Sequence, residues 1–246
     1  MKTYTKQTPI GEITAFANDS FAHQMQSKGY YAEQEILDSH LKEIIEKCDI
    51  ILDIGGHVGY HSVAYCGYNP KAKIKCYEPQ SQVFELLKKN LDRNGFSDRV
   101  EPFNVAVGDK VRKTSLLGHV TDGSNSGINV EFGTSNTFNL GGRQLGVGVE
   151  NIDMITIDSL ELDALDYIKI DVEGAETLVL MGGEYTIKKF KPIICFEFND
   201  FKKLSPEYLK ELGYDSILTP RELLESWGYT KFEGIKYENF IATWGK

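Results

Sequence analysis

The chain has 246 residues, which is enough for one large α/β domain (residues 1–246) with a sizeable core. Its formal charge of −9, with no basic run or stripe, argues against nucleic acid as the main partner. The four cysteines lie in or beside apolar stretches without C-x-x-C spacing, so we expect reduced core residues rather than a metal site or disulfide framework. No apolar signal region or bilayer-length span is present, and a cytoplasmic protein is expected.

The first 47 residues predict two accessory elements. Residues 1–29 mix β-forming side chains with polar ones, which indicates an accessory hairpin or lid. From Tyr30 to Lys47 apolar residues recur at helical spacing and predict a helix. Glu33 and Glu35 lie near its start, where acidic side chains stabilise a helix N-terminus. We prefer this role for them over contact with a ligand.

A glycine-rich turn follows the apolar run 50–54 and leads into a second helical pattern. Such a pattern is typical of a parallel strand that passes into a helix at the ligand-binding edge of an α/β sheet. The turn contains the glycines Gly55, Gly56 and Gly59. It reads D-x-G-G-x-x-G, with His57 where a dinucleotide-binding turn needs glycine, so a pyrophosphate site is not matched. Asp53 would repel a phosphate, but it would not repel S-adenosylmethionine (SAM), which carries a sulfonium and an ammonium.

A second acid supports the same ligand. The predicted strand 74–77 ends in Glu78, and Pro79 then leads into a helix that runs through Asn90. A carboxylate at this strand end can accept hydrogen bonds from both ribose hydroxyls of an adenosine. Asp53 and Glu78 in this order therefore predict a SAM pocket.

The next segment predicts a third strand and a long insertion. Arg99 to Val107 reads as one strand whose end would lie near the adenine, which makes Asn104 and Ala106 candidate contacts. Residues 110–149 are rich in glycine and too long for an ordinary connection, so we expect a β-rich lid that binds the acceptor. Its polar candidates for substrate contact are His119, Asp122, Asn125 and Arg143.

Two further acids follow buried strands in the second half of the chain. Asp171 ends the strand 167–170, and Glu197 ends the strand 192–196, so both should reach the edge where open α/β sheets bind ligands. Glu173 and Glu176 lie at the start of the following predicted helix, where negative charge stabilises a helix N-terminus. Glu173 is also a candidate site residue. Lys169 lies on the same face as Asp171, two residues earlier, and is expected to be its ion-pair partner.

The C-terminal part completes the predicted fold. Tyr229 to Ile235 and Phe240 to Trp244 read as an antiparallel hairpin after two short helices. The expected architecture is a Rossmann-like, doubly wound, mostly parallel seven-stranded sheet with an antiparallel last strand.

With these motifs in order, the sequence from about Tyr31 to about Thr243 resembles the FkbM family of SAM-dependent methyltransferases. The distinctive portion is K-I-D-V-E-G-A-E at 169–176, followed by Val179, Leu180 and Gly182. The resemblance implies a class I methyltransferase fold and O-methyl transfer from SAM, often onto a sugar or a polyketide hydroxyl. It implies that Asp53, Gly55, Gly59 and Glu78 hold the cofactor, and that Asp171 and Glu173 lie near the methyl group. His57 stands where the family usually has Asn, and we favour a backbone-positioning role for it.

Two chemical routes fit these residues. In the first, a carboxylate or His removes the acceptor proton; the candidates are Asp171, Glu173, His119 and His61, with Asp171 ahead. In the second, Asp171 and Glu197, with Asn199 or Asp200, bind a divalent cation (Mg or Mn) that lowers the acceptor pKa. The alternatives to an enzyme acting on a sugar or glycan hydroxyl are a SAM-binding interaction module without transferase activity and, less favoured, an NAD-dependent oxidoreductase. The sequence identifies neither the acceptor nor the oligomeric state.

Overall fold

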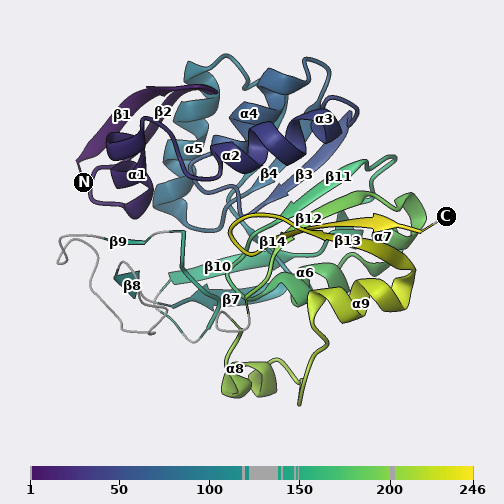
Figure 1. The fold of residues 1–246 in the computed structure, drawn as a ribbon. Helices are drawn as coiled ribbons and strands as arrows, with labels where there is room; N and C mark the ends of the chain where they lie inside the picture. Colours follow the sequence, from purple (N-terminus) through teal and green to yellow (C-terminus); the bar gives the residue numbers. More distant parts are fainter. Residues whose placement is uncertain are drawn as a thin grey trace.

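The fold is built around a mixed sheet in the order β13-β14-β12-β11-β3-β4-β5 (Figure 1). The computed structural model describes residues 2–117, 120–121, 138–139, 141–146, 148, 150–199 and 203–245. The strands of this sheet are β3 (Ile50–Ile54), β4 (Lys73–Tyr77), β5 (Val100–Phe103), β11 (Tyr167–Ile170), β12 (Ile193–Glu197), β13 (Tyr229–Gly234) and β14 (Asn239–Trp244). β14 runs antiparallel to both of its neighbours, and the other strands are parallel to one another. An α/β fold with a large, mostly parallel sheet agrees with the prediction.

Helices cover both faces of this sheet, as the two layers in Figure 1 show. One face carries α1 (Ser20–Lys28), α2 (Gln34–Ile36), a π-helical turn (Leu37–Leu41), α3 (Lys42–Ile45), α4 (Tyr60–Tyr68) and α5 (Ser81–Arg93). The other face carries α6 (Glu176–Met181), α7 (Glu184–Phe190) and α9 (Pro220–Trp227). β3 and β11 are buried on both faces, which explains their continuous apolar sequences.

The predicted N-terminal hairpin is formed by β1 (Thr3–Thr8) and β2 (Gly11–Phe16), which pair antiparallel. The hairpin packs against α5 and is followed by α1. The predicted helix 30–47 is present as α2, the π-helical turn and α3 in succession.

The prediction of one strand from Arg99 to Val107 is wrong. β5 belongs to the main sheet, but β6 (Ala106–Val107) pairs with β10 (Glu150–Ile155) in a second sheet of order β6-β10-β7, where β7 is Arg112–Leu116. The chain turns between β5 and β6 because the Asn104 amide donates to the carbonyl oxygens of Glu78 and Pro79, at 2.9 and 3.0 Å. The two remaining strands, β8 (Val120–Thr121) and β9 (Phe138–Asn139), pair with each other.

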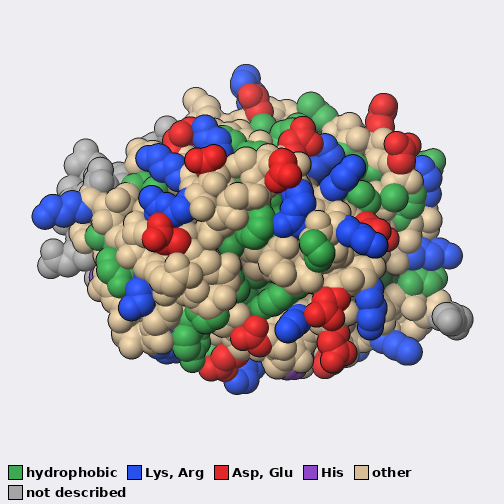
Figure 2. All heavy atoms as spheres, turned by 90° about the horizontal axis from the view of Figure 1, so that it is seen from above, with side chains coloured by type: hydrophobic (Ala, Val, Ile, Leu, Met, Phe, Trp, Pro, Cys, Tyr) green, Lys and Arg blue, Asp and Glu red, His purple; other side chains and the backbone are tan. Residues whose placement is uncertain are grey.

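Three smaller elements complete the description: a 3-10 turn (Asp158–Leu160), α8 (Pro206–Glu211) and the capping box that begins α9 at Thr219. All four cysteines are buried and free, as predicted. Burial raises the pKa of the Cys48 and Cys195 thiols to about 12. Acidic and basic side chains are intermixed on the face seen in Figure 2. Within the described part of the chain, no helix has the length and apolar character needed to span a bilayer.

Candidate functional site

The turn after β3 is held against both neighbouring strands. The N–H groups of Gly55 and Gly56 both donate to the Tyr77 carbonyl at the end of β4, at 3.0 and 2.9 Å. Gly55 has φ +83°, and a Cβ there would lie 1.8 Å from the Asp171 carbonyl oxygen. A Cβ at Gly56 would lie 2.2 Å from the Cys76 sulfur. Both positions therefore require glycine, because the Asp171 backbone and the Cys76 side chain leave no space for a Cβ.

Glu78 lies directly beside this turn and is almost fully buried. One carboxylate oxygen accepts a hydrogen bond from the His57 N–H at 2.9 Å, and the other accepts from the Gln80 N–H at 2.8 Å. Burial raises the pKa of Glu78, while the His57 charge and these two hydrogen bonds act against the rise. Each oxygen keeps lone pairs for further donors, so the arrangement can bind a vicinal diol.

Asp53 lies behind the turn, where none of its surface is exposed. It accepts from the Ser62 hydroxyl at 2.6 Å and lies 3.7 Å from the Lys169 ammonium. Lys169 also donates to the Gly55 carbonyl at 3.0 Å and pairs with Asp171 at 3.2 Å, which confirms the predicted Lys169–Asp171 ion pair. The structure thus places Asp53 beneath the turn and not among the residues that line the cavity described next.

A cavity of about 210 Å³ opens at this edge of the sheet. The predicted residues that line it are Gly55, Gly56, His57, His61, Glu78, Pro79, Ala106, Arg143, Asp171, Glu173 and Glu197. Asp53, Gly59 and Asn104 are not among its lining residues. Gly59, with φ +84°, is the N-cap residue of α4, and Asn104 donates to the Glu78 carbonyl in the loop after β4. Both therefore position cavity-lining segments without lining the cavity themselves.

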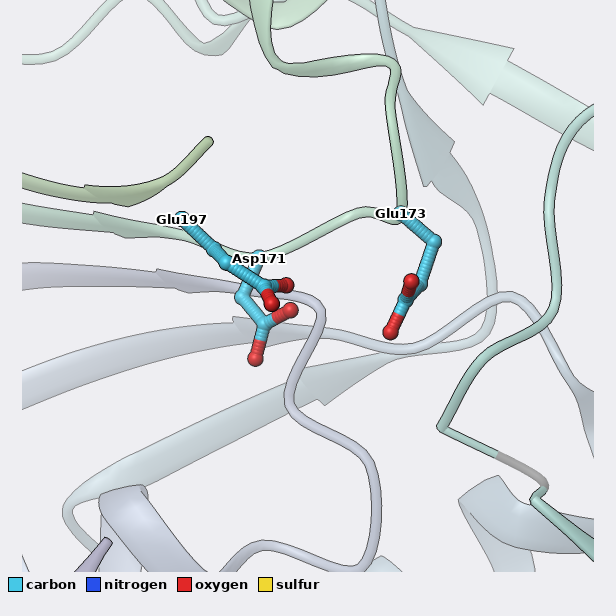
Figure 3. Close-up of side chains that lie close together, drawn as sticks. All are labelled: Asp171, Glu173 and Glu197. Carbon is cyan, nitrogen blue, oxygen red and sulfur yellow. The ribbon is translucent and has the colours of Figure 1, made fainter. Parts of the chain in front are cut away.

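Three carboxylates of the cavity lining lie close together (Figure 3). Asp171 and Glu197 extend from the ends of the neighbouring strands β11 and β12, and Glu173 extends from the loop after β11. One oxygen of each lies within 4.8 Å of the others. Glu173 has φ +55°, an unusual backbone conformation for a glutamate that is often kept at functional sites. The sequence had placed Asp171 and Glu197 together, and the structure adds Glu173 to them.

Glu176 does not join this cluster. Its carboxylate accepts from the N–H groups of Val172 and Gly174, at 3.3 and 3.0 Å, at the start of α6. Burial raises its pKa to about 7. The helix N-terminal reading of Glu176 is confirmed.

Several lining residues were not predicted. Phe21 and Gln24 of α1 line the cavity, as do Tyr31 and Glu33. Glu33 accepts from the Tyr31 hydroxyl at 3.2 Å and pairs with His61 at 3.1 Å. The electrostatic reading of Glu33 as a simple helix-start residue was therefore incomplete. The sequence offered only the short spacing of Tyr31 and Glu33 as a signal, and their place in the cavity depends on tertiary contacts.

Part of the predicted lid also reaches the cavity, through Asn139, Gly141, Arg143 and Leu145. Arg143 is buried and donates to the Leu117 carbonyl at 2.7 Å and to Glu150. The predicted site residues His119, Asp122, Asn125 and Asp200 lie outside the described residues.

The charges of the lining favour a cationic ligand. Among the described lining residues, Glu33, Glu78 and the three clustered carboxylates outnumber the cationic side chains. Lys169, Arg143 and His57 are each paired with a carboxylate. An anionic phosphate would meet this surplus of carboxylates at close range, and a sulfonium or ammonium would be attracted. The site therefore fits SAM in both its charge and its diol-binding carboxylate.

Comparison with known proteins agrees with these features. The family model described as "Methyltransferase FkbM domain" matches residues 53–230. The chain is 28% identical over 175 residues to the 2-O-methyltransferase NoeI of Sinorhizobium fredii, with 64% of this chain and 66% of NoeI covered. It is 26% identical over 163 residues to the AMB antimetabolite synthetase AmbE of Pseudomonas aeruginosa, with 54% of this chain and 8% of AmbE covered.

Two solved structures show the same fold. A methyltransferase FkbM from Methylobacillus flagellatus aligns with a TM-score of 0.52 and 17% identity, covering 80% of this chain and 43% of that one. A putative caffeoyl-CoA O-methyltransferase from Staphylococcus aureus aligns with a TM-score of 0.52 and 14% identity, covering 91% and 90%. The chain thus spans about two thirds of NoeI and under half of the Methylobacillus protein.

Proposed function

Because the chain belongs to the FkbM methyltransferase domain family, we propose that it transfers a methyl group from SAM to a hydroxyl of a sugar, glycan or similar polyhydroxylated small molecule. The observation that carries this proposal is the cavity that Gly55 and Gly56 of the glycine turn line together with the carboxylates of Glu78 and Asp171. The relative NoeI is a 2-O-methyltransferase, which favours an oxygen acceptor. SAM supplies a methyl group that is activated by a positively charged sulfur.

The donor half of the site would use residues at the ends of β3 and β4. Glu78 would accept hydrogen bonds from the ribose hydroxyls, since its two oxygens are already oriented by the N–H groups of His57 and Gln80. Ala106 and Val107 offer an apolar surface for the adenine. Asp53 and Lys169 would keep the turn in place from below.

Asp171 would act as the general base. When the acceptor oxygen attacks the methyl carbon, its proton must move to a nearby group, because an alcohol does not ionise unaided near neutrality. Asp171 is the strongest choice since it ends a central strand, is only partly buried and lies inside the cavity. Lys169 restrains its carboxylate at 3.2 Å, which favours a fixed orientation toward the acceptor.

The acceptor would lie between the carboxylate cluster and the segment 110–149. Asn139, Arg143 and Leu145 of that segment line the cavity, which supports a lid that contacts the acceptor. A sugar or a polyketide-type polyol presents the hydroxyl donors that Glu33 and Glu197 can accept.

A divalent cation is the second candidate for activating the hydroxyl. The close approach of Asp171, Glu173 and Glu197 supports it, because three carboxylates at this spacing repel one another. A divalent cation would compensate more of their charge than the Lys169 ammonium beside Asp171 does. Carboxylate oxygens are suitable ligands for Mg²⁺ or Mn²⁺.

Transfer of labelled methyl groups from SAM to a panel of sugars, glycans and polyketide alcohols tests the proposal. Label in at least one hydroxyl acceptor is the expected result. Calorimetric binding of S-adenosylhomocysteine (SAH) without transfer to any acceptor would instead favour a SAM-binding module. Repeating the active reaction in EDTA separates the two activation routes: loss of turnover that Mg²⁺ or Mn²⁺ restores supports the cation, and unchanged turnover supports the general base.

A further inference from the structure

The N-terminal segment, residues 3–28, lies outside the stretch 53–230 that the family model matches, yet it forms one wall of the cavity. Ser20, Phe21 and Gln24 of this segment line the site. The segment is drawn in dark purple beside α5 in Figure 1. Its contacts with the donor turn therefore bear on how that turn is positioned.

Asn90 of α5 and Asn94, which follows the last residue of that helix, attach the hairpin. The Asn90 carboxamide accepts from the Thr14 N–H at 2.8 Å and donates to the Thr14 carbonyl at 2.9 Å. One helical turn later, Asn94 accepts from the Glu12 N–H at 3.0 Å and donates to the Glu12 carbonyl at 2.9 Å. Each carboxamide thus bonds the N–H and the carbonyl of one β2 residue, as a paired strand would. These bonds hold β2 at a fixed position along α5.

Asn90 also connects the hairpin to the donor turn. Its amide donates a further hydrogen bond to the Val58 carbonyl, at 2.8 Å, and the side chain is completely buried. The hairpin and the glycine turn are thus held by the same side chain, so movement of one would disturb the other.

A second connection runs through Asp19, which precedes α1 and is only 1% exposed. Its carboxylate lies 3.5 Å from His57 Nε2, a distance typical of an ion pair rather than a short hydrogen bond. The ring of Phe21 meets the imidazole edge to face, with 5.3 Å between centroids. The imidazole of the donor turn is therefore enclosed by the N-terminal segment.

His57 connects the N-terminal segment to Glu78 through its backbone. Its φ of +48° is unusual for a residue with a side chain, and its N–H donates to the Glu78 carboxylate. Burial acts to lower the pKa of His57, but the nearby Asp19 carboxylate, together with the charges of Glu78 and Asp171, outweighs it and raises the pKa. A protonated imidazole suits its position between Asp19 and Glu78.

We propose that Asp19 is a positioning residue for the donor site: it fixes the His57 imidazole and so the N–H group that orients Glu78 toward the ribose. The N-terminal segment is then an integral part of the SAM site rather than an accessory to it. This inference rests on the proposed function, because it names SAM as the ligand.

The first test measures SAH binding by calorimetry in the full chain. Asp19→Asn keeps the side-chain shape and removes the charge, and it should raise the Kd for SAH about tenfold, with a larger effect on the KM for SAM than on kcat. Glu12→Gln is the matched control, because it removes the exposed Glu12–Arg93 ion pair between the same hairpin and α5 without touching the donor turn. It should leave the Kd within about twofold.

A double-variant cycle tests whether Asp19 acts through His57. His57→Asn places a residue that tolerates positive φ at the same position. If Asp19 works through the imidazole, Asp19→Asn should cause little further loss of SAH affinity in the His57→Asn background. Fully additive losses, or an Asp19→Asn protein that binds SAH like the wild type, would overturn the proposal.

A measurement without ligand distinguishes this inference from the proposed function. NMR titration should show that the His57 imidazole loses its proton at lower pH in Asp19→Asn than in the wild type. An unchanged titration refutes the Asp19–His57 pairing, whatever the protein binds. If the two proteins differ in this titration but the wild type binds neither SAM nor SAH, the proposed function is refuted. The role of Asp19 in donor binding is then refuted with it.

Discussion

Replacing Glu78 with glutamine is the most direct test of the donor site. The substitution keeps the volume of the side chain but leaves one accepting oxygen and no charge. In the wild type the two oxygens take the His57 and Gln80 N–H groups, and each can accept one ribose hydroxyl. The variant therefore loses one charged hydrogen bond to the ribose and weakens the other. A hydrogen bond to a charged group contributes about 1.5–3 kcal/mol, so the Kd for SAH should rise roughly 10- to 150-fold.

The folded protein itself should change less. The NH2 group of the glutamine would face one of the two backbone N–H groups and cannot accept its hydrogen bond, which costs about 1–3 kcal/mol of folding stability. In return, the variant no longer buries a carboxylate whose pKa is raised by burial. These two effects oppose each other. Calorimetry with SAH and thermal unfolding without ligand separate affinity from stability.

Glu101→Gln is the matched control, since Glu101 is an exposed carboxylate on the adjacent strand β5 that pairs with Lys75 and lies away from the cavity. It should change the Kd by less than about twofold, as expected for a surface pair. If Glu78→Gln also bound SAH within twofold of the wild type, the assignment of Glu78 to the ribose would be refuted.

Three further predictions concern the acids and the lysine around the cavity. Asp171→Asn should lower kcat at least about 100-fold in the labelled-methyl assay while SAH still binds in calorimetry, and unchanged turnover would rule out Asp171 as the base. Lys169→Met should destabilise the protein by about 3–5 kcal/mol in denaturant unfolding at pH 7, because Asp53 then stays buried without its cation; a loss below about 1 kcal/mol would contradict this. Glu176, whose pKa is raised from 4.5 to about 7, binds its proton more tightly when folded, so its contribution to stability falls as the pH rises from 4.5 to 7. Glu176→Gln should therefore gain stability relative to the wild type between pH 5 and pH 8, by an amount of the order of 3 kcal/mol, and parallel pH profiles of the two proteins would be evidence against it.

The sheet edge could be predicted because its signals are local. Apolar runs that end in Glu78, Asp171 and Glu197 identify parallel strands and the side at which they end, and the structure places all three carboxylates in one cavity. Gly55 and Gly56 were recognised for the same reason, since a turn between two parallel strands leaves little space for a side chain.

Contacts between distant segments could not be predicted in this way. Asp19 and His57 are separated in the sequence by all the helices that precede β3. The residues around Asp19 and those around His57 give no indication that the two side chains pair. The strand expected from Arg99 to Val107 was divided because the Asn104 side chain bonds to the loop after β4, a tertiary contact that overrides local β propensity. Asp53 was assigned to the ligand because its motif shows an acid near the turn, whereas burial beneath the turn is a property of the packed sheet.

The antiparallel pairing of β7 with β10 has a consequence for the segment that we propose to contact the acceptor. Leu116 and Glu150 are direct partners in that ladder, so the chain leaves the core and returns to it at adjacent points. The entropy cost of closing a loop grows only slowly with its length. The segment between these two residues can therefore be exchanged for a longer or shorter one by grafting at a fixed stem, with the donor half of the molecule left intact.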